Sequence, residues 1–184
     1  MYNTTIFTEQ YHSAHGNVIP QNTKVLGQLS FSCDTTLNDI CIPDHVSSIQ
    51  SYCFSHCVLL SSVTFNSKEI TSIPRGCFLG CENLSNIVLP EGVTELQDEC
   101  FFGCKSLKKI VLPSTVVSIG KYSFSECDQL TSIEIPSNVK NLDLLFKDNC
   151  FEECPIEEGI TPKSSKKEKN KKKGKLCGAT CCIV

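Results

Sequence analysis

The sequence has few of the residues on which several protein classes depend. It holds no tryptophan, one methionine and four tyrosines in 184 residues. No apolar run approaches the roughly 20 residues of a transmembrane helix, so a helical membrane span is not predicted. The first ten residues contain no basic residue followed by an apolar run, and we therefore expect no signal peptide.

The chain also lacks the residue patterns of common catalytic sites. No glycine-rich phosphate loop follows a predicted strand, and no set of serine, histidine and acid stands out. The four histidines, His12, His15, His45 and His56, are interpreted as exposed loop residues. We therefore predict no catalytic residue, no cofactor and no metal site, and we predict that the protein is not an enzyme.

Basic residues are scarce before the last 24 positions. From Thr161 onward the sequence holds eight lysines and one glutamate, a net charge of +7. The whole chain has 17 basic and 20 acidic residues, so the preceding body has nine basic and 19 acidic residues, a net charge of −10. An acidic body is repelled by nucleic acid and by anionic lipid. We expect no nucleic-acid partner, and only the tail is suited to contact a membrane.

The tail itself has the pattern of a lipid anchor. Cys181 stands four residues from the end and the aliphatic Ile183 is next to last, as in a C-a-a-X prenylation signal. One lipid holds a protein on a bilayer only marginally, and a second signal makes the anchor stable. Nearby lysines supply about 1 kcal/mol each beside an anionic leaflet. These lysines are Lys163, Lys166, Lys167, Lys169, Lys171, Lys172, Lys173 and Lys175.

Because of two further cysteines, the sequence does not decide which lipid groups the tail carries. Cys177 could carry a reversible palmitoyl group, and Cys181 with Cys182 resembles the double-cysteine ends of Rab-type small GTPases, which receive two prenyl chains. A lysine run can also be a nuclear import signal or a nucleic-acid patch. We predict that a prenyltransferase modifies the tail. The tail then binds anionic inner-leaflet lipids at the cytosolic face of the plasma membrane, with some protein in the cytosol.

The body is a tandem array with a period of about 23 residues. Each unit has alternating apolar positions, usually followed by a proline, then a second apolar pair that turns the chain back and a phenylalanine. The alternation predicts a short strand with one buried face, which proline ends because it has no N–H to donate. Stacked units share one core. The units begin at Asn17, Ile40, Val63, Ile87, Ile110 and Ile133, and the third step is 24 residues.

Cysteines recur on both sides of the phenylalanines. Closely spaced cysteines can bind zinc, but these pairs follow the repeat, and Ser123 replaces one cysteine. We favour a buried ladder of free thiols, and a cytosolic location predicts that they are reduced. The cysteines concerned are Cys53, Cys57, Cys77, Cys81, Cys100, Cys104, Cys127, Cys150 and Cys154.

The unit L-x-x-I-x-(I/L)-P-x-x-V-x-x-I-x-x-x-(C/A)-F-x-x-C resembles the BspA-like, or treponemal-type, leucine-rich repeat, over residues 17–154. The resemblance implies a curved solenoid with a parallel sheet on its concave side, and binding rather than catalysis. Many bacterial members are surface adhesins, and such repeats are abundant in parasitic protozoa, a source that would suit this chain. We predict an irregular N-terminal segment or cap (1–16), a leucine-rich-repeat solenoid of six units (17–159) and a disordered polybasic tail (160–184).

The outward strand positions form the candidate protein-binding concave face. They are mixed in charge and include an apolar patch at Cys41, Val88 and Val111. Solvated strand residues without a partner are the alternative interpretation. The predicted function is a membrane-anchored interaction scaffold, and the alternatives are a surface adhesin or a nuclear or cytosolic regulator that uses the lysines for import. The ten positions are Asp39, Cys41, Ser62, Thr64, Asn86, Val88, Lys109, Val111, Ser132 and Glu134.

Overall fold

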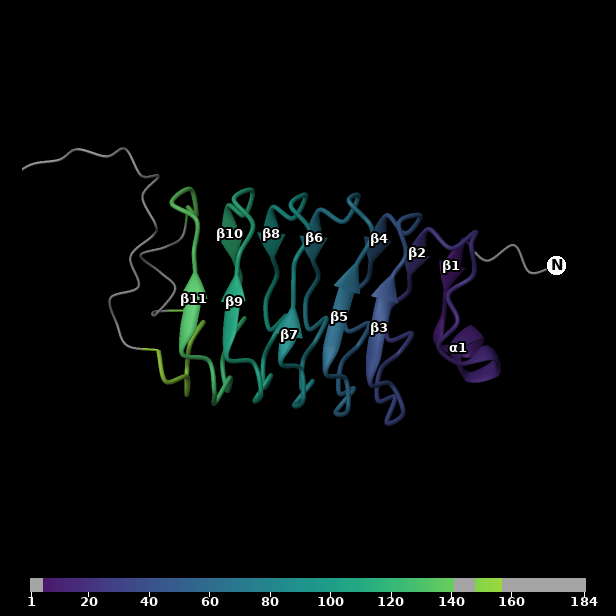
Figure 1. The fold of residues 1–184 in the computed structure, drawn as a ribbon, viewed down its shortest axis with the longest axis horizontal. Coiled ribbons are helices and arrows are strands. Elements are labelled where there is room, and N and C mark those ends of the chain that lie inside the picture. The colour runs from purple at the N-terminus through teal and green to yellow at the C-terminus, as the bar shows by residue number, and fades with distance from the viewer. Residues whose placement is uncertain (1–4, 141–147, 157–184) are drawn as a thin grey trace, which may run out of the picture.

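The structure is a computed structural model that describes residues 5–140 and 148–156. Short parallel strands form a solenoid of about six turns, which lie in a row as Figure 1 shows. The predicted leucine-rich-repeat solenoid is confirmed. Within the described residues, no helix has both the length and the apolar character needed to cross a membrane.

The first strand of each repeat has one buried and one outward face. Its hydrogen bonds join β3, β5 and β7 in one parallel sheet and β9 and β11 in another. In β3, Ile40 and Ile42 are buried while Asp39 and Cys41 are exposed, as the alternation predicts. The strands are β3 (Asp39–Ile42), β5 (Ser62–Phe65), β7 (Asn86–Ile87), β9 (Lys109–Val111) and β11 (Ser132–Glu134).

The second residue of the second apolar pair, such as Ile49, also lies on a short strand, where the sequence predicts only a chain reversal. The reversal precedes the strand: the carbonyl of Pro43 accepts a hydrogen bond from the amide of Val46 at 3.1 Å. The second strands run opposite to the first in Figure 1. They are β1 (Ile6–Phe7), β2 (Val25–Leu26), β4 (Ser48–Ile49), β6 (Ser72–Ile73), β8 (Glu95–Leu96) and β10 (Ser118–Ile119).

This second row of strands is interrupted between β4 and β6. Hydrogen bonds join β1, β2 and β4 on one side and β6, β8 and β10 on the other. The amide of Gln50 donates to the carbonyl of Leu26, but the equivalent residue of the next turn is Pro74, which has no N–H. The 24-residue step also falls between these strands, and the hydroxyl of Ser67 in that segment donates to the carbonyl of Val46.

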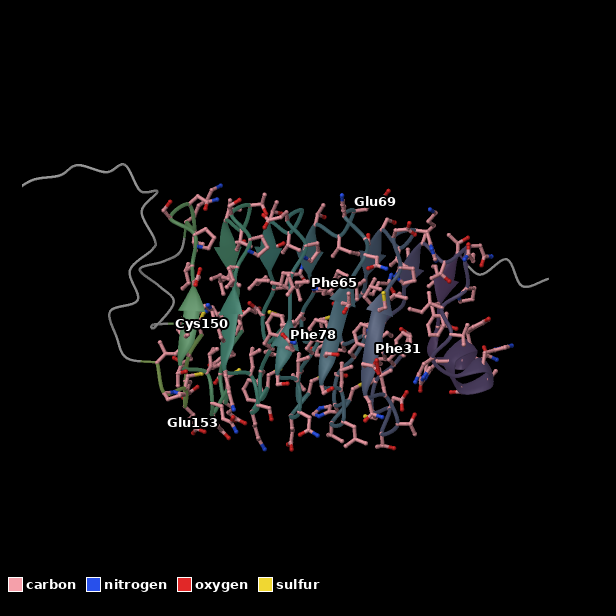
Figure 2. The ribbon with its side chains drawn as sticks, in the orientation of Figure 1. Phe31, Phe65, Glu69, Phe78, Cys150 and Glu153 are labelled. Atoms are coloured by element: carbon pink, nitrogen blue, oxygen red, sulfur yellow. The ribbon has the colours of Figure 1, made fainter. Side chains whose placement is uncertain are left out.

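A stack of six phenylalanine rings, here called the phenylalanine spine, runs through the interior. Neighbouring ring centroids are 5.0–5.7 Å apart and the planes differ by 5–19°, which is an offset-stacked arrangement. Every ring is at most 6% exposed, so the phenylalanines that recur in the repeat form one buried stack. Its members are Phe31, Phe54, Phe78, Phe101, Phe124 and Phe151, of which Figure 2 labels Phe31 and Phe78.

The backbone beside the spine forms a third ladder. The amide of Phe54 donates to the carbonyl of Cys77 in the next turn at 2.9 Å, and the amides of Tyr52 and His56 donate to the same turn. In a parallel β-strand the amides between these three would donate to the opposite neighbour. Here the amide of Ser55 instead bonds back to the carbonyl of Tyr52 in its own turn, so the ladder amides donate only toward the next turn. The backbone is left-handed at Tyr52 (φ 58°) and His56 (φ 57°). In the next turn Gly76 takes this position, where an added Cβ would lie 2.3 Å from the Tyr52 ring.

A short helix, α1 (Glu9–His15), closes the N-terminal end of the solenoid. Thr8 is its N-cap, and the Thr8 side chain accepts a hydrogen bond from the amide of Tyr11. The ring of Phe7 stacks on Phe31 at 4.7 Å, although Phe7 lies on β1 and not at a spine position of the repeat. Between residues 5 and 16 the N-terminal segment is therefore a folded cap with a strand and a helix.

Three of the four histidines are not exposed loop residues, which corrects the prediction: His15 is exposed but lies on α1, and His12 and His45 are half-buried. His12 lies on α1, where its Nε2 is 2.7 Å from Asn17 Oδ1 and 3.1 Å from Asp34 Oδ2. His45 is half-buried, and its Nε2 lies 3.0 Å from the carbonyl oxygen of Pro20. Both imidazoles thus join the N-terminal turns to their neighbours, which the variable positions of the repeat did not indicate.

Candidate functional site

The ten outward positions lie on the outer side of the β3–β5–β7 and β9–β11 sheets, and we call their surface the strand face. Residues in register on neighbouring strands are in adjacent turns: Cys41 is opposite Thr64, and Lys109 is opposite Ser132. Seven of the ten side chains are exposed. The other three, Ser62, Ser132 and Glu134, are half-buried.

Two exposed valines mark the middle of the strand face. Val88 is 76% exposed and Val111 is 50% exposed, at equivalent positions of consecutive turns. Burying apolar surface under a partner stabilises a complex by about 25 cal/mol per Å² of apolar area removed from water. Single exposed apolar residues are common on proteins, but two at one place on a regular frame form a patch that a partner can cover.

A groove of about 350 Å³ borders Val88 between β5 and the segment after β7. Thr64 and Asn86 supply polar groups to it, and Leu89 forms part of its apolar wall. Phe65 also borders the groove and is only half-buried, although it occupies an inward position of the repeat. Sequence reasoning missed Phe65 as a site residue. The available signal was a phenylalanine where the neighbouring units have isoleucine or leucine.

The charges of the strand face are partly paired. Lys109 Nζ is 3.2 Å from Glu134 Oε1, a diagonal ion pair between β9 and β11. Both side chains are partly exposed, so the pair contributes little to stability. It leaves a locally neutral surface beside Val111. Asp39 is exposed at the opposite end of the face, on β3.

The repeated cysteines are inside, with one exception at the C-terminal turn. One row, here called the outer thiol column, consists of the cysteines three residues after the last five phenylalanines of the spine. Each Sγ–H donates to the carbonyl of the spine phenylalanine in the preceding turn. Cys57, for example, donates to the carbonyl of Phe31 at 2.9 Å. The column consists of Cys57, Cys81, Cys104, Cys127 and Cys154, and only Cys154 is half-buried.

Burial keeps the fully buried cysteines of both rows protonated. Loss of solvation raises the pKa of Cys57 to about 12 and that of Cys150 to about 12. Burial also raises the pKa of Cys77 well above its ordinary value. A thiol must be deprotonated to bind a metal. In the part of the chain that the structure describes, no group of three or more histidine, cysteine or acidic side chains could hold a metal ion. The buried positions of the thiol ladder are confirmed for every member except Cys154, which is half-buried.

The predicted anchor lies outside the described residues. This applies to Cys177, Cys181 and Cys182 and to the lysines from Lys163 to Lys175. Prenylation, the possible palmitoyl group and the contact with anionic lipid therefore stay predictions, and the strand face is the candidate site that the structure describes.

Parallel strands, a shared interior and an outward strand face define a leucine-rich-repeat solenoid, a class of protein that binds partners on extended surfaces. The chain belongs to the BspA-type leucine-rich-repeat family. The family model described as "BspA type Leucine rich repeat region" matches residues 4–119 and 94–171, in six copies. The predicted BspA-like repeat is confirmed. A search of curated proteins finds no match.

Three solved structures from bacteria are similar. A leucine rich cell surface protein from Faecalibacterium prausnitzii is 32% identical, with a TM-score of 0.62 over 77% of this chain and 35% of that one. The leucine rich repeat protein of T. pallidum is 25% identical (TM-score 0.58; 67% and 58%). One from Eubacterium ventriosum is 26% identical (TM-score 0.67; 82% and 39%). This chain thus spans between about a third and three fifths of their lengths.

Buried thiols predict a loss of stability at alkaline pH. Thiols of the unfolded chain ionise above about pH 8.5, whereas Cys57 in the folded chain stays protonated up to about pH 12. The stabilisation is complete below pH 8.5 and is lost as the pH rises toward 12, because the unfolded state releases its proton first. We expect Cys57→Ala to reduce the fall in unfolding free energy between pH 8.5 and 9.5 by about 1 kcal/mol.

Urea unfolding at the two pH values measures this effect. The matched control is Cys41→Ala, which removes an exposed thiol and should leave the pH dependence of the parent chain unchanged. An equal pH dependence for Cys57→Ala and the parent chain would show that the buried thiol ionises as readily in the folded state.

Proposed function

We propose that this protein is a membrane-anchored interaction scaffold. Its solenoid binds a protein partner through the strand face, and its tail holds it at the cytosolic face of the plasma membrane. The main support for the proposal is a pair of exposed valines at equivalent positions of consecutive turns, Val88 and Val111, of which Val88 borders a groove. Binding, and not catalysis, is the activity of such a surface.

The strand face supports a partner that inserts an apolar side chain. Val88 and Leu89 form an apolar border of the groove, and Thr64 and Asn86 at its sides can hydrogen-bond to a backbone. Because the strands are fixed by the ladders and by the interior stack, few of these groups lose freedom on binding. A pre-ordered surface of this kind converts more of its contact energy into affinity.

The tail supports the membrane part of the proposal. A prenyl group on Cys181 and eight lysines supply the two signals that a stable anchor requires, and palmitoyl on Cys177 or a second prenyl on Cys182 would strengthen it. The signal acts at a free carboxyl terminus, so the proposal requires Val184 to be the last residue in the cell. A prenyl anchor belongs to eukaryotic cells, which agrees with a protozoan source.

A second candidate function is adhesion at the cell surface. One observation favours it: the F. prausnitzii protein, described as a leucine rich cell surface protein, is 32% identical over 77% of this chain. This chain covers 35% of that protein, so the parts that place it at a surface need not be present here. The two candidates predict opposite faces of the membrane, and that difference can be measured.

The first test is the location of the chain beside Cys181→Ser. We expect the parent chain in the membrane fraction and at least tenfold more of Cys181→Ser in the soluble fraction, because the prenyl group is lost. Cys41→Ser is the matched control, since Cys41 is an exposed cysteine of the solenoid, and it should stay with the membrane. Equal distribution of the parent chain and Cys181→Ser contradicts the anchor. Digestion of the chain by protease added to intact cells supports adhesion instead.

The second test concerns the strand face. Partners are cross-linked to the chain in cells, and we expect Val88→Lys and Val111→Lys to reduce the cross-linked species at least tenfold, because a charge in the apolar patch must be desolvated on binding. Val18→Lys is the control, since Val18 is 70% exposed and lies outside the strand face. If all three variants retain the cross-links of the parent chain, the partner binds elsewhere.

A further inference from the structure

The C-terminal end of the outer thiol column holds two cysteines in adjacent turns. The turns are in direct contact here: the amide of Glu126 donates to the carbonyl of Glu152 at 2.8 Å. Neighbouring extended backbones lie about 4.8 Å apart, and disulfides span Cα separations of about 4.4–6.8 Å. Cys127 follows Glu126 by one position and Cys154 follows Glu152 by two, and the two thiol groups lie close enough to interact.

Cys154 differs from the rest of the column in its surroundings. The other four thiols are fully buried, whereas Cys154 is half-buried and open to a small reagent. Its Sγ donates to the carbonyl of Phe124 at 2.6 Å. Interaction with the Cys127 thiol lowers the pKa of Cys154, and interaction with Cys154 together with burial raises the pKa of Cys127. Cys154 is therefore the first of the two thiols to ionise, and Cys127 is the neighbouring thiol that can react with it.

We propose that Cys154 and Cys127 form a reversible disulfide when the protein meets a hydroperoxide. The Cys154 thiolate attacks one oxygen of the peroxide and breaks the O–O bond, which leaves a sulfenic acid on Cys154. The expelled alkoxide, or hydroxide if the oxidant is hydrogen peroxide, takes up the proton that the Cys154 thiol released and leaves as an alcohol or as water. Cys127 Sγ then attacks the Cys154 sulfur and expels hydroxide, which takes the Cys127 proton and leaves as water. Two thiols are oxidised by two electrons, and one peroxide bond is reduced.

The neighbouring cysteines are placed less well for this chemistry. Cys104 is fully buried, so a peroxide does not reach it in the folded chain. Cys150 belongs to the other row of the repeat, where the residue of the adjacent turn is Ser123, and its own Sγ donates to the carbonyl of Gly120 at 3.0 Å. The last described turn, labelled by Cys150 and Glu153 in Figure 2, therefore contains one reactive thiol with one thiol partner.

Peptide mapping of the full-length chain tests the proposal without any substitution. The reduced protein is treated with hydrogen peroxide, blocked with an alkylating reagent and digested with trypsin, which places Cys127 in peptide 122–140 and Cys154 in peptide 148–163. We expect a peptide pair 122–140/148–163, joined through Cys154 in the fragment spectrum, that dithiothreitol abolishes. We also expect the Cys154 thiol to disappear at least tenfold faster than the Cys104 thiol.

Variants then assign the partners. Cys154→Ser should abolish the joined peptide, and Cys104→Ser, a matched change in the same column, should retain it, with circular dichroism showing that each variant is folded. Several outcomes overturn the proposal. These are a joined peptide that contains Cys150 in place of Cys154, a disulfide from Cys154 to a cysteine of the tail, or Cys154 oxidised to sulfinic acid with Cys127 still reduced.

Discussion

The stacking of phenylalanine rings, together with the one-way amide ladder beside them, is the interaction on which the solenoid depends. Both rows of β-strands are interrupted, between β4 and β6 and between β7 and β9. The spine is not: its rings stack without a gap from Phe31 to Phe151. Where the strands part, the amide of Phe54 still donates to the next turn. The spine therefore holds the turns in register where the sheets do not.

Because the spine joins the turns, the strands can be short or interrupted without separating them. A β-ladder would have to be complete if it alone joined the turns, and Pro74 or an extra residue near Ser67 would then be costly. Because the spine supplies the contact between turns, β7 can be only two residues long. The chain after β7 is then free to diverge from β5, and the groove beside Val88 lies between them. The ladder has its own cost, since Tyr52 and His56 must adopt left-handed backbone.

The period and the inward or outward direction of most side chains could be predicted from the sequence. Alternation at Asp39–Ile42 indicates which residues face the core, and the recurrence of phenylalanine indicates the spine. The second row of strands could not be found, because a pair such as Ser48–Ile49 is too short to show a period. The one-way ladder also had no clear signal: its left-handed positions hold glycine in some turns but tyrosine, histidine or glutamate in others.

The candidate site was predicted in its positions but not in its shape. Val88 and Val111 were identified as an apolar patch, since alternation alone places them outward. The groove depends on how β7 leaves β5 and on the size of Phe65, which are properties of packing between turns. His12 at the N-terminal cap was missed for the same reason, because its partner Asp34 is 22 residues away in the sequence.

Hydrogen exchange of the backbone amides would test the spine most directly. The account predicts that the amides of Phe54, Phe78 and Phe101 exchange as slowly as the amides that pair β3 with β5, and that they do so across the gap between β4 and β6. They would then be released only when the whole solenoid opens. Exchange of the spine amides a hundredfold faster than that of the strand amides would contradict the account, because the strands and not the spine would then hold the turns together.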